Sequence, residues 1–326
     1  MIRLGIAGCG RIVERGYLPA ALAADGVTIA AFADPNRERL HTCLNLWREG
    51  DGEGQAYSDL AGLLAAEAID LLVVAAPLDR HVALAEQAAA ADVRSLVEKP
   101  PAPDLAGALR LAELEPEPIL AFNRRFLQGA ELRGSIPAEG WIELDLELRF
   151  KQGAWGAHEV RDEALLDAGI HLIDLACHLS GAVPIAVRQA QIEPRRATFE
   201  LELSRGRARI ECATDRSHRE VVSVRDRSGK VLARSAWGGP RSRLAGLAGK
   251  PDPLVLSLRR QLEALRDTTT PDPAFVLWTP EPGKGRTPLA HAADGVTAMA
   301  VVEAARRSAA LNGAEVTVAP VAEVSA

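Results

Sequence analysis

The chain has 326 residues and a net charge of −6, and 48% of its residues are hydrophobic and 25% are charged. This balance is that of an ordinary folded protein, and it excludes collagen-like, coiled-coil and disordered chains. The acidic total disfavours a general nucleic-acid-binding protein, and the length suits two domains. Four widely spaced cysteines without a C-x-x-C pair indicate neither a disulfide framework nor a zinc site. No export signal or membrane-span-length apolar stretch is visible, so we expect a cytoplasmic protein.

Strand and helix signals alternate along the first 122 residues. Buried strands alternating with helices predict a parallel sheet covered on both faces, a doubly wound α/β domain. The expected strands are continuous apolar runs, at residues 2–7, 27–33, 70–76, 95–97 and 119–122. The expected helices have apolar residues at helical spacing, at 12–24, 36–48, 59–67, 80–91 and 104–113.

The remainder, residues 123–326, predicts an α+β domain with a large, mostly antiparallel open sheet. Apolar and polar residues alternate along its expected strands, as in a sheet with one solvated face, at 141–150, 185–192, 198–203, 207–212, 220–225 and 231–235. Helices are expected at 165–179, 254–266 and 290–310, and the last can pack back near the first domain. Residues 271–288 are rich in proline and glycine and predict a loop.

A glycine turn joins the first expected strand to the first expected helix. Gly8 permits a tight turn, and Gly10 lets the backbone approach a pyrophosphate bound at the helix amino end. Asp34 closes the second strand, where a carboxylate accepts hydrogen bonds from ribose hydroxyls and repels a 2′-phosphate. This favours NAD, while the nearby Arg37 leaves NADP open. The alternative is a plain glycine turn with Asp34 capping the next helix.

Lys99 lies between Glu98 and two prolines, directly after an expected strand. The carboxyl ends of the strands form the ligand crevice of a doubly wound sheet. A lysine at this edge can polarise a carbonyl or relay a proton. The alternative is a solvated loop lysine.

Asp167 and His171 are four residues apart on an expected helix, so they share one face. A carboxylate beside an imidazole orients the ring and raises its basicity, as a base that removes a hydroxyl proton requires. The alternatives are a buried histidine satisfied by a helix carboxylate, packing roles for Asp174 and His178, and metal ligands. Because no H-E-x-x-H spacing supports a metal, we expect none.

Taken together, these motifs resemble the Gfo/Idh/MocA oxidoreductase family, which includes glucose–fructose oxidoreductase and inositol dehydrogenase. The likeness extends over nearly the whole chain, through Gly8-Cys9-Gly10-Arg11-Ile12, Ala33-Asp34-Pro35, Ala76-Pro77 before His81, Glu98-Lys99-Pro100, Asn123-Arg124-Arg125-Phe126, Asp167-Ala168-Gly169-Ile170-His171 and a closing helix from Asp294 to Ser308. Val13, Tyr17 and Leu78 depart from the residues that are usual in the family.

The resemblance implies an N-terminal Rossmann dinucleotide-binding domain, residues 1–122, and a substrate-binding and oligomerisation domain, residues 123–326. It implies that Lys99, Asp167 and His171 surround the reacting carbon as catalytic and substrate-binding residues. Asn123 and Arg124 follow a strand near the domain junction, so we expect substrate contacts there, with interdomain packing as the alternative. The expected cofactor contacts are Gly8, Gly10, Arg11, Ile12, Asp34, Arg37, Ala76, Pro77, His81, Glu98 and Lys99.

The function implied is an NAD(P)-dependent oxidoreductase. It would transfer a hydride between nicotinamide and a hydroxyl or keto carbon of a sugar, cyclitol or sugar derivative, nucleotide-linked ones included. A non-catalytic NAD-binding regulator and NAD-assisted glycosidic cleavage or elimination are the alternatives. We expect no nucleic-acid or membrane partner, and a homo-oligomer, dimer or tetramer, formed through the C-terminal sheet.

Overall fold

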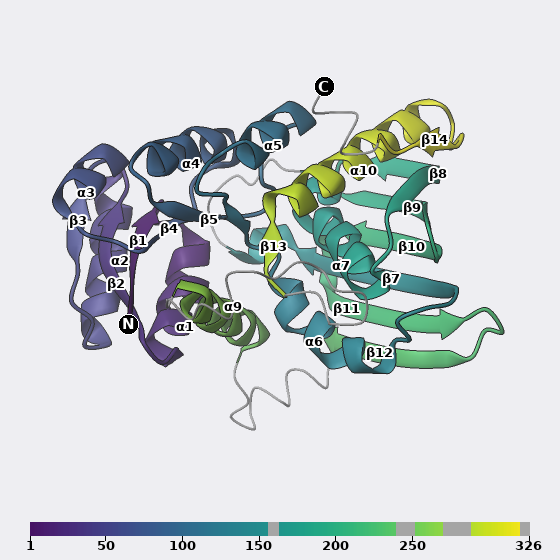
Figure 1. Ribbon diagram of the computed structural model, residues 1–326, viewed down its shortest axis with the longest axis horizontal. Helices are drawn as coiled ribbons and strands as arrows, with labels where there is room; N and C mark the ends of the chain where they lie inside the picture. The colour runs from purple at the N-terminus through teal and green to yellow at the C-terminus, as the bar shows by residue number, and fades with distance from the viewer. Residues whose placement is uncertain (156–162, 239–251, 270–287, 320–326) are drawn as a thin grey trace. The chain divides into compact units, whose positions relative to one another are not determined.

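The computed structural model describes residues 1–155, 163–238, 252–269 and 288–319. Its contacts divide the chain into two units, Met1–Phe126 with Asp252–Ala292, and Leu127–Pro251 with Ala293–Ala326. Each unit is built on one seven-stranded sheet (Figure 1). The α/β fold expected from the sequence is confirmed, with a parallel sheet in the first unit and a largely antiparallel one in the second. The sequence pattern places the division after residue 122, whereas the contacts group residues 252–292 with the first unit.

The sheet of the first unit has the strand order β13-β6-β5-β4-β1-β2-β3. All neighbouring pairs are parallel except β13 with β6. Because β1 leads to β2 on one side and β4 leads to β5 on the other, the order reverses between β1 and β4, the place where such sheets bind ligands. The strands are β1 (Ile2–Ala7), β2 (Val27–Ala33), β3 (Gln55–Tyr57), β4 (Leu71–Val74), β5 (Arg94–Val97), β6 (Ile119–Leu120) and β13 (Ala290–His291).

Helices cover both faces of this sheet. Alternate residues of β1, among them Leu4 and Ile6, join a buried cluster that includes Leu258 and Leu262 of α9. On the other face of β1, a Cβ at Gly5 would meet Leu63 of α3, and Figure 1 shows α3, α4 and α5 in one row. The helical segments are η1 (Val13–Tyr17), α1 (Leu18–Ala23), α2 (Arg37–Glu49), α3 (Leu60–Ala66), η2 (Leu78–Arg80), α4 (His81–Ala90), α5 (Leu105–Ala112), η3 (Asn123–Phe126) and α9 (Pro253–Thr269).

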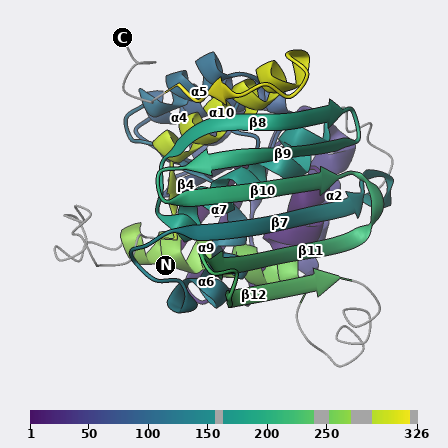
Figure 2. The ribbon, with the colours of Figure 1, turned by 90° about the vertical axis from the view of Figure 1, so that its right-hand side faces the viewer.

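The second sheet has the strand order β12-β11-β7-β10-β9-β8-β14, and Figure 2 shows the strands from β12 to β8 side by side. Only the pair β7 and β10 is parallel. Along β7 the residues alternate between buried and half-buried, as the period of two predicts. The strands are β7 (Ile142–Lys151), β8 (Pro184–Glu193), β9 (Arg196–Leu203), β10 (Gly206–Ala213), β11 (Asp215–Asp226), β12 (Val231–Gly238) and β14 (Val316–Thr317).

Helix α7 (Ile170–Ser180) packs against β7 and β10, and every one of its residues is buried. The five-residue segment before it, η6 (Leu165–Gly169), is a π-helical turn that also contacts β10. The other helical segments of this unit are α6 (Gln128–Leu132), η4 (Arg133–Ser135), η5 (Gln152–Trp155) and α10 (Ala292–Ala310). In the part of the chain that the structure describes, no helix combines the length and apolarity needed to cross a membrane.

Most expected elements are present within a few residues of their predicted bounds. Two expected helices differ, because each begins with a π-helical turn, η1 and η6, where regular α-helix is expected. The short strands β3, β13 and β14 are not predicted by the sequence pattern. The proline- and glycine-rich loop expected at 271–288 lies almost entirely outside the described residues.

Candidate functional site

The glycine turn after β1 has the backbone that a phosphate-binding loop requires. Gly8 has φ +97°, and a Cβ there would lie 2.5 Å from the carbonyl oxygen of Ala75, so only glycine fits. Its N–H donates to Ala33 O at 2.8 Å and holds the turn against the end of β2. A Cβ built on Gly10 meets nothing within 4 Å. The residues that the structure describes thus leave open space beside Gly10, as the close approach of a pyrophosphate requires.

After this turn, Gly10 O accepts the N–H groups of Val13 at 3.0 Å and Glu14 at 3.1 Å. The N–H groups of Arg11 and Ile12 come before these two donors, so they lie at the amino end of the helix, where an anion is stabilised. The Arg11 guanidinium forms an ion pair with Glu14 at 2.6 Å. Residues 8–12 therefore provide a turn and helix start of the kind that binds a pyrophosphate.

Asp34 is buried at the end of β2 and joins the glycine turn to the next helix. Its Oδ2 accepts the N–H of Cys9 at 2.7 Å, and its Oδ1 accepts the N–H of Asn36 at 2.8 Å. Each carboxylate oxygen has a second lone pair, so ribose hydroxyls can still donate to it. The helix cap expected as the alternative role of Asp34 is wrong, because Asn36 caps α2 by accepting Arg39 N–H. Arg37, the first residue of α2, is exposed.

His81 connects the ends of β4 and β5 from the first residue of α4. Its ring is 2% exposed, with Nε2 2.8 Å from Ala76 O and Nδ1 2.9 Å from Pro100 O. Pro77, beside Ala76, is exposed at the strand end. His81 therefore ties Ala76 to the loop that carries Lys99.

Glu98 is a buried carboxylate immediately before Lys99, which is half-buried. Its Oε1 accepts the hydroxyl of Tyr17 at 2.8 Å, and its Oε2 accepts the N–H of Lys99 at 3.1 Å. Burial raises the pKa of Glu98, against the opposing effects of the Lys99 charge and the Tyr17 hydrogen bond. The Lys99–Pro100 peptide bond is cis. Tyr17 is absent from the residues expected at the site, because the sequence marks it only as a departure from the family pattern and gives no sign of its partner.

Asn123 and Arg124 belong to η3, which follows β6. Asn123 is buried, and its Oδ1 accepts Arg124 Nη1 at 2.9 Å. Arg125 is buried and donates to Leu289 O at 3.1 Å, so it holds the segment before β13. Because β1, β2, β4, β5 and β6 are parallel, the residues that follow them all lie at one edge of the sheet. That edge carries every expected site residue of the first unit.

Asp167 and His171 lie on consecutive segments of one helix in the second unit, Asp167 in the π-helical turn η6 and His171 in α7. Both are buried, at 8% and 4% exposed. Asp167 Oδ2 accepts the side-chain amide of Gln152 at 2.9 Å, a partner that the sequence pattern does not reveal. Gly169 is closely packed, since a Cβ there would lie 3.0 Å from Leu165 Cδ1 and 3.2 Å from Cys212 Sγ. The π-helical turn therefore fits closely against β10 and places the Asp167 carboxylate beside Gln152.

Farther along α7, Asp174 and His178 are also buried. The Nη1 of Arg133 lies 3.3 Å from Nε2 of His178, and a guanidinium can only donate, so this ring nitrogen accepts. His178 therefore contacts η4. Among the described residues, no group of three or more His, Cys, Asp and Glu side chains is arranged to hold a metal ion.

Residues 2–119 match the model of the family Gfo/Idh/MocA, described as an oxidoreductase family with an NAD-binding Rossmann fold. The chain is 30% identical to the D-apiose dehydrogenase of Paraburkholderia graminis over 188 residues, 54% of this chain and 49% of that protein. It is 27% identical to the inositol 2-dehydrogenase of Acidothermus cellulolyticus over 266 residues, 82% of this chain and 65% of that protein. The chain thus spans about half the length of D-apiose dehydrogenase and under two thirds of the second relative.

The fold is that of solved dehydrogenases. The structure of myo-inositol dehydrogenase from Lactobacillus casei, in complex with NAD(H) and myo-inositol, superposes with a TM-score of 0.73 at 15% identity. The superposition covers 98% of this chain and 97% of that one. Residues 2–119 thus match the Gfo/Idh/MocA model of NAD-binding oxidoreductases, and both units have the fold of this solved dehydrogenase.

Proposed function

We propose that the protein is an NAD-dependent dehydrogenase that interconverts a hydroxyl and a keto group on a sugar, cyclitol or sugar derivative. The observation that carries the proposal is the carboxyl edge of the first sheet, where the open space beside Gly10, the helix start and Asp34 suit a dinucleotide. Lys99 follows β5 at that same edge. The names of two relatives, D-apiose dehydrogenase and inositol 2-dehydrogenase, support a polyhydroxylated substrate.

Each residue has a defined task in the proposed reaction. NAD supplies the acceptor for the hydride that leaves the carbon bearing the hydroxyl. His171 takes the hydroxyl proton at a ring nitrogen, and the buried Asp167 carboxylate orients and stabilises the charged ring. Lys99 donates a hydrogen bond to the substrate oxygen as its charge develops. In the reverse direction His171 returns the proton to that oxygen.

The cofactor preference follows from Asp34. Its carboxylate is buried and held by two backbone N–H groups, so it cannot easily turn away from a ligand at the end of β2. A ribose with free hydroxyls donates hydrogen bonds to such a carboxylate, whereas a 2′-phosphate is repelled by the negative charge of the carboxylate. We therefore infer a preference for NAD over NADP. Of Asn123 and Arg124, the half-buried Arg124 has the guanidinium that suits a substrate oxygen or phosphate.

The test is a panel of aldoses, inositols and nucleotide sugars, incubated with NAD and followed by the absorbance of NADH. We expect NADH and ketone in equal amounts with one of these classes. Lys99→Ala and His171→Ala should each lower kcat by about 100-fold or more, as the loss of a positioned proton-transfer group does, with little change in NAD affinity. Lys230→Ala and His218→Ala change exposed residues of the same types and should keep full activity.

Three results would each contradict the proposal or part of it. Cleavage or elimination of the substrate without net NADH would instead indicate chemistry in which the hydride returns to the product. NAD binding without turnover of any compound in the panel would indicate a regulatory protein. Full turnover by both Lys99→Ala and His171→Ala would remove these residues from the catalytic roles.

A further inference from the structure

Tyr17, the last residue of the π-helical turn η1, reaches the loop that carries Lys99. Its side chain is 1% exposed, and its hydroxyl donates to Glu98 Oε1 at 2.8 Å. Glu98 is 8% exposed. A hydroxyl and a carboxylate removed from water in this way destabilise the fold unless they are paired. The pair therefore connects the helix that begins at the glycine turn to the end of β5.

The backbone on both sides of Lys99 is held by buried side chains. The second oxygen of Glu98, Oε2, accepts the N–H of Lys99 at 3.1 Å. The N–H of Glu98 donates to Val74 O in β4 at 3.0 Å. After Lys99, the carbonyl of Pro100 lies 2.9 Å from Nδ1 of His81. The direction in which the Lys99 side chain leaves the loop is thus set by Glu98 and His81.

The charge on Glu98 depends on its neighbours. Burial raises its pKa, while the Lys99 charge, the Tyr17 hydroxyl, the Lys99 N–H and the His81 charge all lower it. The carboxylate in turn raises the pKa of Tyr17, together with the burial of that residue. The Tyr17 hydroxyl therefore opposes the rise that burial causes in the pKa of Glu98 and favours the ionised form, which is the stronger acceptor for the Lys99 N–H.

We propose that Tyr17 and Glu98 are positioning residues for Lys99. The tyrosine hydroxyl holds Glu98 as a carboxylate, and the carboxylate fixes the backbone from which the lysine side chain extends. This inference rests on the role proposed above for Lys99 in the reaction. Tyr17 would therefore affect turnover by fixing the position of Lys99, without itself contacting the substrate.

The chain contains a matched control for this interaction. Tyr57 is its only other tyrosine, and its hydroxyl donates to Glu67 Oε1 at 2.8 Å. This second tyrosine–glutamate pair belongs to β3 and the end of α3, and Tyr57 is only half-buried. Tyr57→Phe removes the same type of hydrogen bond from the same unit at a place that does not hold the Lys99 loop.

The kinetic test is a double-mutant cycle. We expect Tyr17→Phe to lower kcat about tenfold, the loss of one hydrogen bond to a charged group, with the KM for NAD nearly unchanged. In the Lys99→Ala background the same substitution should cause no further loss. Tyr57→Phe should keep the rate of the wild type, and Tyr17→His, which retains a donor, should recover part of the loss. An equal loss with and without Lys99 would show a general structural effect and overturn the proposal.

A second measurement tests the pair without any turnover. The infrared band of the protonated Glu98 carboxyl, identified by its absence in Glu98→Gln, gives the pH at which this residue titrates. Because the Tyr17 hydroxyl stabilises the carboxylate, Tyr17→Phe should move that midpoint to higher pH, and Tyr57→Phe should not. An unmoved midpoint in Tyr17→Phe overturns the inference. Absence of dehydrogenase activity in the wild type would overturn the proposed function instead, and the infrared result would still decide whether the pair forms.

Discussion

Gly8 and Gly10 lie in the same turn after β1, but the structure explains the two glycines in different ways. Gly8 is required by the protein itself, since its φ is +97° and a Cβ would lie 2.5 Å from Ala75 O. The fold does not require glycine at position 10, because a Cβ there meets no atom of the described residues within 4 Å. The sequence predicts the turn from the spacing of both residues, but only the coordinates separate a fold requirement from a ligand requirement. The distinction can be tested with the same substitution at both positions.

We expect Gly8→Ala to destabilise the protein by about 1–3 kcal/mol through backbone strain, with the clash against Ala75 in addition. Gly10→Ala should leave the melting temperature nearly unchanged and weaken NAD binding by about tenfold or more, because its methyl group occupies the space that a pyrophosphate needs. Thermal melts and calorimetric titration with NAD measure the two effects. Unchanged NAD affinity in Gly10→Ala would exclude residues 8–12 as the phosphate-binding turn.

Asp34 and Tyr17 show what the sequence can predict about a single residue and what it cannot: it can predict a position at a strand end, but not a contact with a distant residue. The position of Asp34 after β2 follows from the apolar run before it, so its place at the strand end is predictable. Its bond to Cys9 N–H is not, since it depends on how two adjacent strands are aligned. The contact between Tyr17 and Glu98 joins residues 81 positions apart, and nothing in the local pattern of either residue indicates it.

At the scale of elements, the π-helical turn η6 depends on a neighbour that is distant in sequence. Arg306 of α10 donates from Nε to Glu163 Oε1 at 2.8 Å. The carbonyl of Glu163 accepts the N–H groups of both Leu166 and Asp167 at 3.0 Å. The ion pair therefore anchors the residue from which the turn starts, and through it the position of the Asp167 carboxylate.

Arg306→Leu should consequently lower kcat several-fold, in proportion to the displacement of Asp167, with a stability loss of about 1 kcal/mol or less because the ion pair is partly exposed. Arg196→Leu is the matched control, since it removes a comparably exposed ion pair with Asp215 in the same unit. Steady-state kinetics and melting temperatures compare the two. If both variants lose activity equally, the effect of Arg306 does not pass through η6.

The elements show why some structure is predictable and some is not. Long apolar runs and period-two alternation determine β1, β2 and β7, because burial of one or both faces leaves few other residue choices. The sequence does not predict β3, because its three residues are exposed or half-buried and so form no apolar run. The amphipathic pattern of α9 predicts a buried face but not the cluster it joins, most of which comes from residues 2–47. No local signal marks the π-helical turns.

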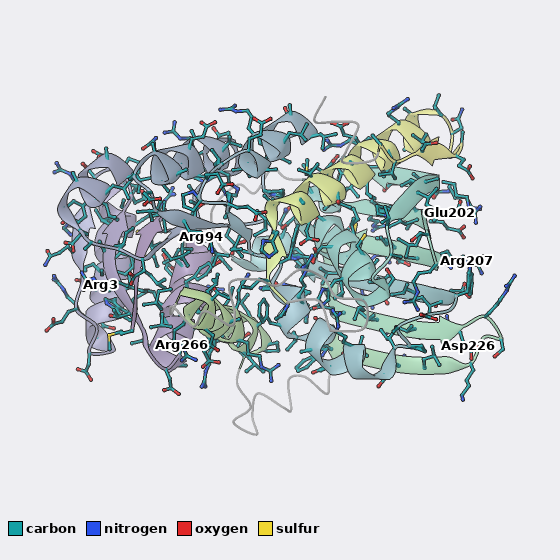
Figure 3. All side chains as sticks on the ribbon, viewed as in Figure 1. Arg3, Arg94, Glu202, Arg207, Asp226 and Arg266 are labelled. Carbon is teal, nitrogen blue, oxygen red and sulfur yellow. The ribbon has the colours of Figure 1, made fainter. Side chains whose placement is uncertain are left out.

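At the scale of the whole molecule, the outer face of the second sheet is arranged in stripes of opposite charge. β7 carries Glu143, Asp145 and Glu147 on this face, and β10 beside it carries Arg207 and Arg209. Arg207 pairs with Glu143 at 2.6 Å. The next strand, β9, is again acidic, and Figure 3 shows Glu202 and Arg207 directed away from α7. The face is thus charged and partly neutralised within itself.

If the protein forms a homo-oligomer through this face, as we propose from the resemblance, the contact is electrostatic. An acidic stripe of one copy can lie over a basic stripe of another, as a two-fold axis parallel to the strands allows. Sedimentation should then show association that weakens as salt rises, since interactions between exposed charges are largely screened beyond about 10 Å at 0.1 M salt and beyond shorter distances at higher salt. Arg207→Glu should weaken association further, and Arg3→Glu, an exposed arginine of the first unit that pairs with Glu67, should not. Association that strengthens with salt would indicate an apolar interface and place it on another surface.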